Sequence, residues 1–203
     1  MAAEKYLRDI IILWATIDPI STLLIFVALT ADRSQEERNR IALRATLYAA
    51  ILLLGSIVLG QLLLTAMGIS MVAFQLAGGI ILFLFALKFI FGVLTEAPGS
   101  LTSEEDIAVF PLAIPTIATP GAILAVIVLT DNRLFPLPVQ LGTAVITILL
   151  LAITYLIMRA SSQVLGIIGK QGAAMLVRVM GLVLAALSVQ LIFDAIASRE
   201  FPF

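Results

Sequence analysis

The sequence predicts an all-α membrane protein whose six transmembrane helices form two inverted three-helix repeats, with helices one and four broken near mid-membrane. Composition is the first observation. Of the 203 residues, 62% are hydrophobic and 12% are charged, whereas soluble domains are about half apolar and a quarter charged. The second observation is a set of six apolar segments, and the third is a likeness between the halves of the chain. We expect residues 1–203 to form a single transmembrane domain.

Each apolar segment is about as long as a membrane-spanning helix, which needs about 20 mostly apolar residues. The segments run approximately from Arg8 to Thr30, Arg44 to Met67, Ser70 to Leu94, Ile107 to Leu129, Pro138 to Met158 and Ala174 to Ala197. Between the first two segments, Ser34 and Glu37 have the spacing of a capping box. This spacing predicts that the second helix begins outside the membrane.

The first segment of each half has a similar order of residues. "WATIDPISTLLIFVALTADR" at 14–33 matches "IPTIATPGAILAVIVLTDNR" at 114–133, and helices three and six match around Gly79 and Gly181. We therefore expect repeat one at about 7–94, an acidic linker at about 95–106 and repeat two at about 107–198. Because a unit has three spans, the second copy is inverted, which is typical of many secondary transporters.

A proline interrupts each matching segment near its centre. Asp18 precedes Pro19, and Thr119 precedes Pro120. Proline disfavours helical geometry in the residue before it, and Asp or Thr followed by Pro is also a common way to begin a helix. Each segment is then either a kinked helix or two half-helices. In the second case, two new helix N-termini, with free N–H groups and positive dipoles, would frame a central site.

Polar and small residues around these breaks are the candidate substrate-binding residues. They are Thr16, Asp18, Pro19, Ser21, Thr116, Thr119, Pro120 and Gly121, with Gln75, Gly78 and Gly79 on the third helix. Gln75 is interpreted either as a contact between helices or as a cavity residue, and Gly78 and Gly79 as positions of close packing. Gly121 is expected to let a ligand approach the backbone closely.

Asp18 is the candidate coupling residue, because a carboxyl at mid-membrane costs about 3 kcal/mol to insert. A purely structural helix cap is the alternative. If the half-helices form, we expect the N–H groups after Thr119 to bind a substrate carboxylate. The end at Asp18 should then attract an ammonium group, a proton or Na⁺.

The composition excludes several kinds of chemistry. The chain has no cysteine and no histidine, which removes disulfides, thiolates, imidazole bases and most zinc or haem sites. We find no nucleophile–base pair, and expect neither enzyme activity, nor a cofactor, nor a metal. A net charge of −1 without a basic patch gives no reason to expect nucleic acid. The expected partners are a small-molecule substrate and membrane lipid; a homo-oligomer is left open.

Basic residues predict the orientation, because cytoplasmic loops are enriched in Lys and Arg. One side has Arg33, Arg38, Arg40, Arg44, Arg159, Lys170 and Arg178, and the other has Lys5, Arg8, Arg133 and Arg199. We therefore expect both termini on the extracytoplasmic side.

Four stretches carry a resemblance to a known family. They are "DPISTLLIFVALT", "GISMVAFQLAGGIILFLFALKFIFG", "IAVFPLAIPTIATPGAI" and "MGLVLAALSVQLI". At these residues the chain resembles the MarC family, also described as six-helix neutral amino acid transporters. The resemblance implies a multi-pass protein of the prokaryotic inner membrane. It also implies transport of small neutral amino acids such as glycine and alanine, driven by an H⁺ or Na⁺ gradient. An uncoupled channel or exporter, and a scaffold without transport, are the alternatives.

Overall fold

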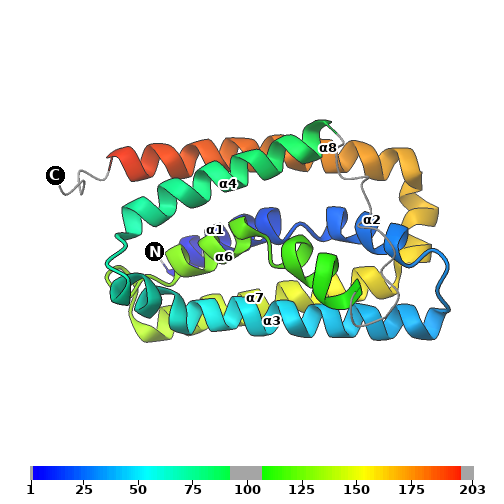
Figure 1. Cartoon of the computed structure of the whole chain (residues 1–203), viewed down its shortest axis with the longest axis horizontal. Coiled ribbons are helices and arrows are strands. Elements are labelled where there is room, and N and C mark those ends of the chain that lie inside the picture. Colours follow the sequence, from blue (N-terminus) through cyan, green and yellow to red (C-terminus); the bar gives the residue numbers. More distant parts are fainter. Residues whose placement is uncertain (1, 92–106, 198–203) are drawn as a thin grey trace.

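The computed structural model describes residues 2–91 and 107–197, and its regular elements are helices (Figure 1). In chain order they are α1 (Ala2–Ile17), α2 (Pro19–Leu29), α3 (Gln35–Ala66), α4 (Met71–Phe91), η2 (Ala108–Ile117), α6 (Pro120–Leu129), α7 (Leu137–Arg159) and α8 (Ser161–Ala197). The acidic linker expected at 95–106 lies outside the described residues, as do positions 92–94 and 198.

The start of α3 confirms the capping box. Ser34 Oγ accepts from the backbone N–H of Glu37 at 3.3 Å, and Glu37 Oε2 accepts from the N–H of Ser34 at 2.7 Å. Two N–H groups that the first turn leaves without helical partners are thereby satisfied. The helix therefore begins well before the apolar segment that starts at Arg44.

The start expected for the last helix is wrong. We expected it near Ala174, but α8 begins at Ser161 and continues to Ala197. Residues 161–173 contain three glycines, at 166, 169 and 172, which weaken a helix, but no proline. A glycine costs about 1 kcal/mol in a helix, whereas proline costs about 3. Residues 161–173 consequently form a helical segment, which rises at the right-hand end of the bundle (Figure 1).

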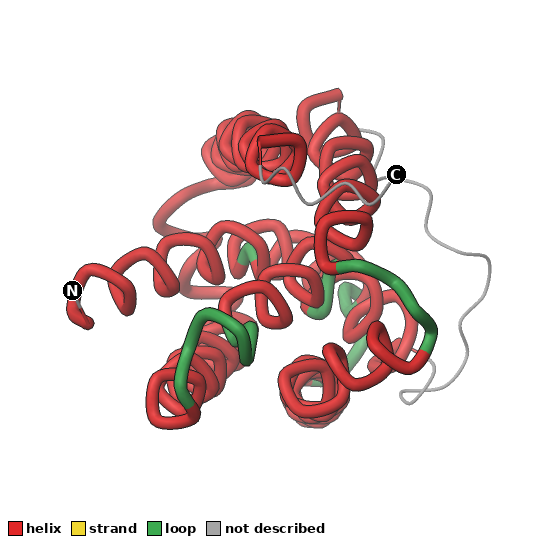
Figure 2. Tube along the Cα trace, turned by 90° about the vertical axis from the view of Figure 1, so that its left-hand side faces the viewer, coloured by secondary structure: helices red, strands yellow, loops and turns green. Residues whose placement is uncertain are grey.

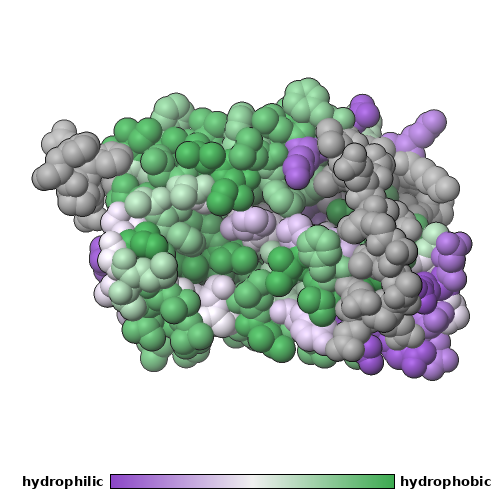
Figure 3. All heavy atoms as spheres, in the orientation of Figure 1, coloured by the Kyte–Doolittle hydropathy of each residue, from purple (hydrophilic) through white to green (hydrophobic). Residues whose placement is uncertain are grey.

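The surface is that of a membrane protein. Within the described residues, four helical segments are long and apolar enough to span a membrane: Glu4–Val27, which joins α1 and α2, and Gln35–Ala66, Met71–Phe91 and Leu137–Arg159. The bent pair of η2 and α6 makes a fifth if it is counted as one span, and Gly181–Ala197 is a shorter apolar helix. Large apolar side chains such as Ile51, Val58 and Leu62 are more than 60% exposed. Figure 3 shows the apolar surface across the molecule and hydrophilic residues at the end where α3 begins.

The broken segments lie inside the bundle. The pair α1–α2 contacts α6, α7 and α8, while η2 and α6 contact α3 and α4. Figure 2 shows loop segments enclosed by helices as well as those at the ends. Buried residues of both broken segments, including Leu13, Ile17, Ile117 and Ala122, belong to one hydrophobic core.

Several contacts between helices are reciprocal between the two halves of the chain. Helix α1 packs on α7 as η2 packs on α3, and α2 packs on α7 as α6 packs on α3. Likewise, α2 contacts α8 as α6 contacts α4. Two further pairs, α3 with α7 and α4 with α8, join helices at matching positions of the two halves. The contacts of α6 with α7, of α1 with α8 and of α7 with α8 have no equally extensive counterpart among the described residues.

Glycines allow α4 and α8 to pack closely. An added Cβ at Gly79 would lie 2.8 Å from Ile192 Cγ1 and 3.2 Å from the backbone oxygen of Ser188. On α8, an added Cβ at Gly181 would lie 2.9 Å from Phe89 Cβ and 3.1 Å from the backbone oxygen of Ala86. Small residues serve this purpose in membrane helix interfaces. The pair runs side by side along one face of the bundle (Figure 1).

Candidate functional site

The first break is at Asp18. Helix α1 ends at Ile17, and Asp18 takes a left-handed backbone conformation with φ 47° and ψ 73° before α2 begins at Pro19. Aspartate tolerates this region better than most non-glycine residues. Its Oδ1 accepts from the N–H of Ser21 at 3.1 Å, and its Oδ2 accepts from Ser21 Oγ at 2.5 Å. The chain therefore forms two half-helices here rather than one kinked helix, with Asp18 as the cap of the second.

The second break ends at Thr119. In η2, the backbone departs from helical geometry at Phe110, Ile114 and Pro115. Thr119 is extended, and its Oγ1 accepts from the N–H of Ala122 at 2.8 Å as the cap of α6. The axes of η2 and α6 differ by 55°. Each break thus has the cap and the following proline that the sequence predicted.

The two breaks meet in the interior. Thr119 Oγ1 donates to the backbone oxygen of Thr16 at 2.8 Å, 103 positions away in the chain. Thr16 lies in the last turn of α1, where carbonyl groups lose their helical partners. Thr16, Asp18 and Thr119 are all at most 3% exposed. The hydrogen bond therefore joins the end of one half-helix to the start of another in a buried environment.

Helix direction places two N-termini at this junction. Lys5, near the start of α1, contacts Leu129 at the end of α6, while Thr16 contacts Thr119 at its start. Helices α1 and α6 are therefore antiparallel, and α2 and α6 both begin near the junction. Helix N-termini carry a partial positive charge of about half an elementary charge. The junction consequently combines two positive dipole ends with one carboxyl group, that of Asp18.

The hydroxyl groups of Thr16, Thr116 and Ser21 form hydrogen bonds within their own segments. Thr16 Oγ1 donates to the oxygen of Ile12 at 2.9 Å, and Thr116 Oγ1 donates to that of Pro111 at 2.8 Å. The hydroxyl of Ser21 donates to Asp18. These bonds satisfy hydroxyl groups in the interior, so a ligand that used them would have to replace an existing partner.

The candidate glycines serve helix packing. Leu82 fills the place of a side chain at Gly121, where an added Cβ would lie 2.3 Å from Leu82 Cδ1. At Gly78, an added Cβ would lie 2.6 Å from Leu124 Cδ2. Helices α4 and α6 therefore approach closely, and Gln75 is half-buried one turn before Gly78. A role of these residues in ligand binding stays a prediction.

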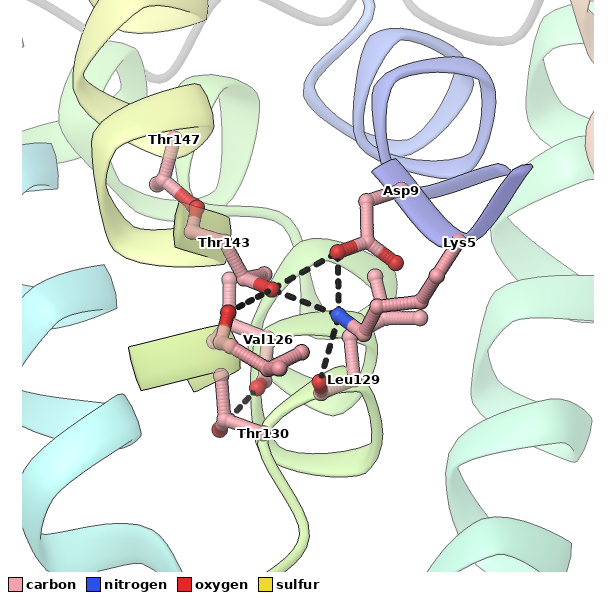
Figure 4. Close-up of polar contacts among 8 residues, drawn as sticks. Lys5, Asp9, Val126, Leu129, Thr130, Thr143 and Thr147 are labelled. Atoms are coloured by element: carbon pink, nitrogen blue, oxygen red, sulfur yellow. Dashed lines mark hydrogen bonds and ion pairs between the residues drawn. The ribbon is translucent and has the colours of Figure 1, made fainter. Parts of the chain in front are cut away.

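The sequence analysis missed a polar cluster at the start of α1. Lys5 Nζ donates to Asp9 Oδ2, to Thr143 Oγ1 on α7 at 2.7 Å and to the backbone oxygen of Leu129 at 3.2 Å (Figure 4). Asp9 is completely buried. The sequence does indicate an ion pair here, because Lys5 and Asp9 are four residues apart on one helix. We had used Lys5 only for orientation and had not considered Asp9.

Comparison with known proteins identifies the family. The family model described as "MarC family integral membrane protein" matches residues 3–199. The chain belongs to the MarC family. MarC-family relatives include a "UPF0056 membrane protein" of Archaeoglobus fulgidus, 35% identical over 199 residues, covering 92% of this chain and 90% of the relative. The inner membrane protein YhgN of Escherichia coli K12 is 33% identical, with 92% and 93% covered.

The printed names of these MarC-family relatives state a membrane location and no substrate. No solved structure matches the chain significantly. The resemblance found in the sequence is confirmed, and this protein is an integral membrane protein.

Proposed function

We propose that this protein is a secondary transporter of small neutral amino acids such as glycine or alanine, coupled to an H⁺ or Na⁺ gradient. The observation that carries the proposal is the buried junction of two half-helix starts, one capped by Asp18 and the other by Thr119. Broken helices that meet in the interior are a common form of transporter binding site.

The junction suits a ligand that carries one negative and one positive charge. The start of α6 has no acidic residue in its first turn, so its positive dipole end favours a carboxylate, for which the N–H of Ala122 would exchange its bond to Thr119 Oγ1. Asp18 offers negative charge at the start of α2, which suits the ammonium group of the same ligand, a proton or Na⁺. Charge-assisted hydrogen bonds contribute about 1.5–3 kcal/mol each, and two of them are a large share of the affinity of so small a ligand.

Reciprocal packing supports the inverted repeat. A pseudo-two-fold axis in the membrane plane would exchange α1 with η2, α2 with α6, α3 with α7 and α4 with α8. Under that exchange, the contact of α1 with α7 becomes that of η2 with α3, and the pairs α3–α7 and α4–α8 map onto themselves. We propose six spans on this basis, with the apolar part of α8 as the sixth.

The proposed orientation places both termini outside the cytoplasm, since arginines gather where α3 begins. Reporter fusions to the two ends should give an extracytoplasmic signal from each, as six spans require both ends on one side. Alkaline phosphatase would be active and green fluorescent protein dark in these fusions. The opposite readout from both ends would invert the orientation, and a split readout would exclude an even number of spans.

Counterflow in proteoliposomes tests the function. Vesicles loaded with unlabelled glycine or alanine, diluted into traces of the labelled amino acid, should accumulate label transiently above its equilibrium level. Protein-free vesicles are the control. Rapid equilibration without this overshoot would indicate a channel. Flux no faster than in the control, for a panel of neutral amino acids, would contradict transport of this class and favour a scaffold.

A further inference from the structure

A second buried polar site lies at the end of the bundle where α1 begins. Asp9, Thr143 and the backbone oxygen of Leu129 surround one nitrogen, Lys5 Nζ (Figure 4). These groups come from α1, α7 and the last residue of α6, respectively. Thr143 Oγ1 also donates to Asp9 Oδ2 at 2.6 Å, which holds the carboxylate in place. The site is thus formed by three segments that are distant in the sequence.

The chemistry of this site matches a primary ammonium group. An ammonium carries three N–H donors, and the site offers one carboxylate, one hydroxyl and one carbonyl acceptor to it. The carbonyl lies at a helix C-terminus, where the dipole favours a cation. The ring of Phe135 lies 4.6 Å from Lys5 Nζ and that of Tyr6 lies 5.8 Å away, both within the range of cation–π attraction.

The bound lysine leaves part of the site unsatisfied. Asp9 Oδ1 is buried and has no hydrogen-bond partner, and an unpaired buried oxygen of this kind costs free energy. The side chain of Lys5 is 13% exposed, whereas that of Asp9 is 0% exposed. The lysine side chain is therefore closer to the surface than the carboxylate that it binds.

We propose that this cluster is a primary-ammonium site in which Lys5 is a tethered occupant that an amine-bearing ligand displaces. This rests on the proposed function only for the identity of the ligand, the amino group of a substrate that arrives at this end. Lys5 connects α1 to α6 and α7. Its displacement removes that connection and frees the end of the bundle to open.

The first experiment measures thermal unfolding of the purified full-length protein in detergent. Lys5→Ala should lower the Tm, and methylammonium at tens of millimolar should restore about 2–4 °C of it. Wild type should gain less, because Lys5 competes. Tetramethylammonium, which has no N–H donor, and Na⁺ at equal ionic strength should not restore the Tm. Arg8→Ala removes an exposed cation from the same helix and should respond to methylammonium no more than wild type does.

A double variant, Lys5→Ala with Asp9→Asn, should lose the rescue because the carboxylate is gone. Equal effects of methylammonium on Lys5→Ala and Arg8→Ala would overturn the proposal, and so would a larger effect of Na⁺. A positive rescue with negative counterflow would retain this site and reject transport. Positive counterflow without rescue would support transport and reject the ammonium site.

A second variant keeps the test informative if Lys5→Ala fails to fold. The chain has no cysteine, so Lys5→Cys has a single thiol. Its modification with an aminoethyl thiosulfonate rebuilds a tethered ammonium, whereas the trimethylammonium analogue adds charge without donors. Only the first should raise the Tm toward that of wild type. Equal effects of the two reagents would show that charge alone matters and would contradict an ammonium site.

Discussion

Replacing Asp18 by asparagine should abolish ion-driven accumulation of substrate and leave the protein folded in the membrane. Asparagine can still cap α2 and tolerates the left-handed conformation that Asp18 adopts. It removes the charge and the capacity to bind a proton, and it replaces Oδ2, which accepts from Ser21 Oγ, by an amide NH2 that can donate to that hydroxyl. The measurement is uptake of labelled glycine or alanine into proteoliposomes under imposed H⁺ or Na⁺ gradients, compared with wild type at equal protein content.

Asp18→Ala is the matched comparison. Alanine loses the cap, worth about 1 kcal/mol, and occupies a left-handed conformation at a cost of about 1–2 kcal/mol. We expect this variant to lose both stability and uptake, and Asp18→Asn to lose uptake alone. If Asp18→Asn concentrates substrate as wild type does, under both gradients, Asp18 is a structural cap and the coupling mechanism is wrong.

Replacing Gly181 by leucine should separate α4 from α8. The backbone oxygen of Ala86 lies 3.1 Å from the position of the added Cβ, and backbone cannot move aside as a flexible side chain can. Overpacking of this kind costs about 1–3 kcal/mol or more, which lowers the Tm by roughly 5–10 °C at the upper part of that range. Thermal unfolding in detergent measures the shift.

Gly55→Leu provides the control, because an added Cβ at Gly55 on α3 meets no atom within 4 Å. Both substitutions replace a helical glycine and gain about 1 kcal/mol of helix propensity. The difference between the two therefore isolates the steric contact. A Gly181→Leu protein as stable as Gly55→Leu would mean that the close packing of α4 on α8 does not contribute to the fold.

Local signals predicted the breaks well. A cap followed by proline fixes where a helix begins, so Asp18 and Thr119 could be assigned from neighbouring residues alone. The capping box at Ser34 was predictable for the same reason. The hydrogen bond between Thr119 and Thr16 could not be predicted from local patterns, because these do not show which segments pack together. Only the matching positions of the two breaks indicated that they lie close to each other.

Other features depend on tertiary contacts that a sequence does not reveal. The side of Gly121 that we expected a ligand to approach is filled by Leu82 of α4. The start of α8 was placed too late because glycines weaken a helix without ending it. The pair of Lys5 and Asp9 gained its importance from Leu129, which accepts from Lys5, and from Thr143, which bonds to both. Leu129 and Thr143 are more than a hundred positions away in the chain.

The buried contacts of Asp9 have a consequence for synthesis of the chain. Of the four long apolar segments among the described residues, the first is the most buried, with 56% of its apolar window inside the protein against 17% for that of α3. Its partner Thr143 lies 134 positions after Asp9, which takes on the order of ten seconds to translate. Meanwhile, the nascent first helix holds the two carboxyl groups of Asp9 and Asp18 without its later neighbours, and each costs up to about 3 kcal/mol in lipid. We therefore expect the insertion machinery to retain the first helix until α6 and α7 emerge.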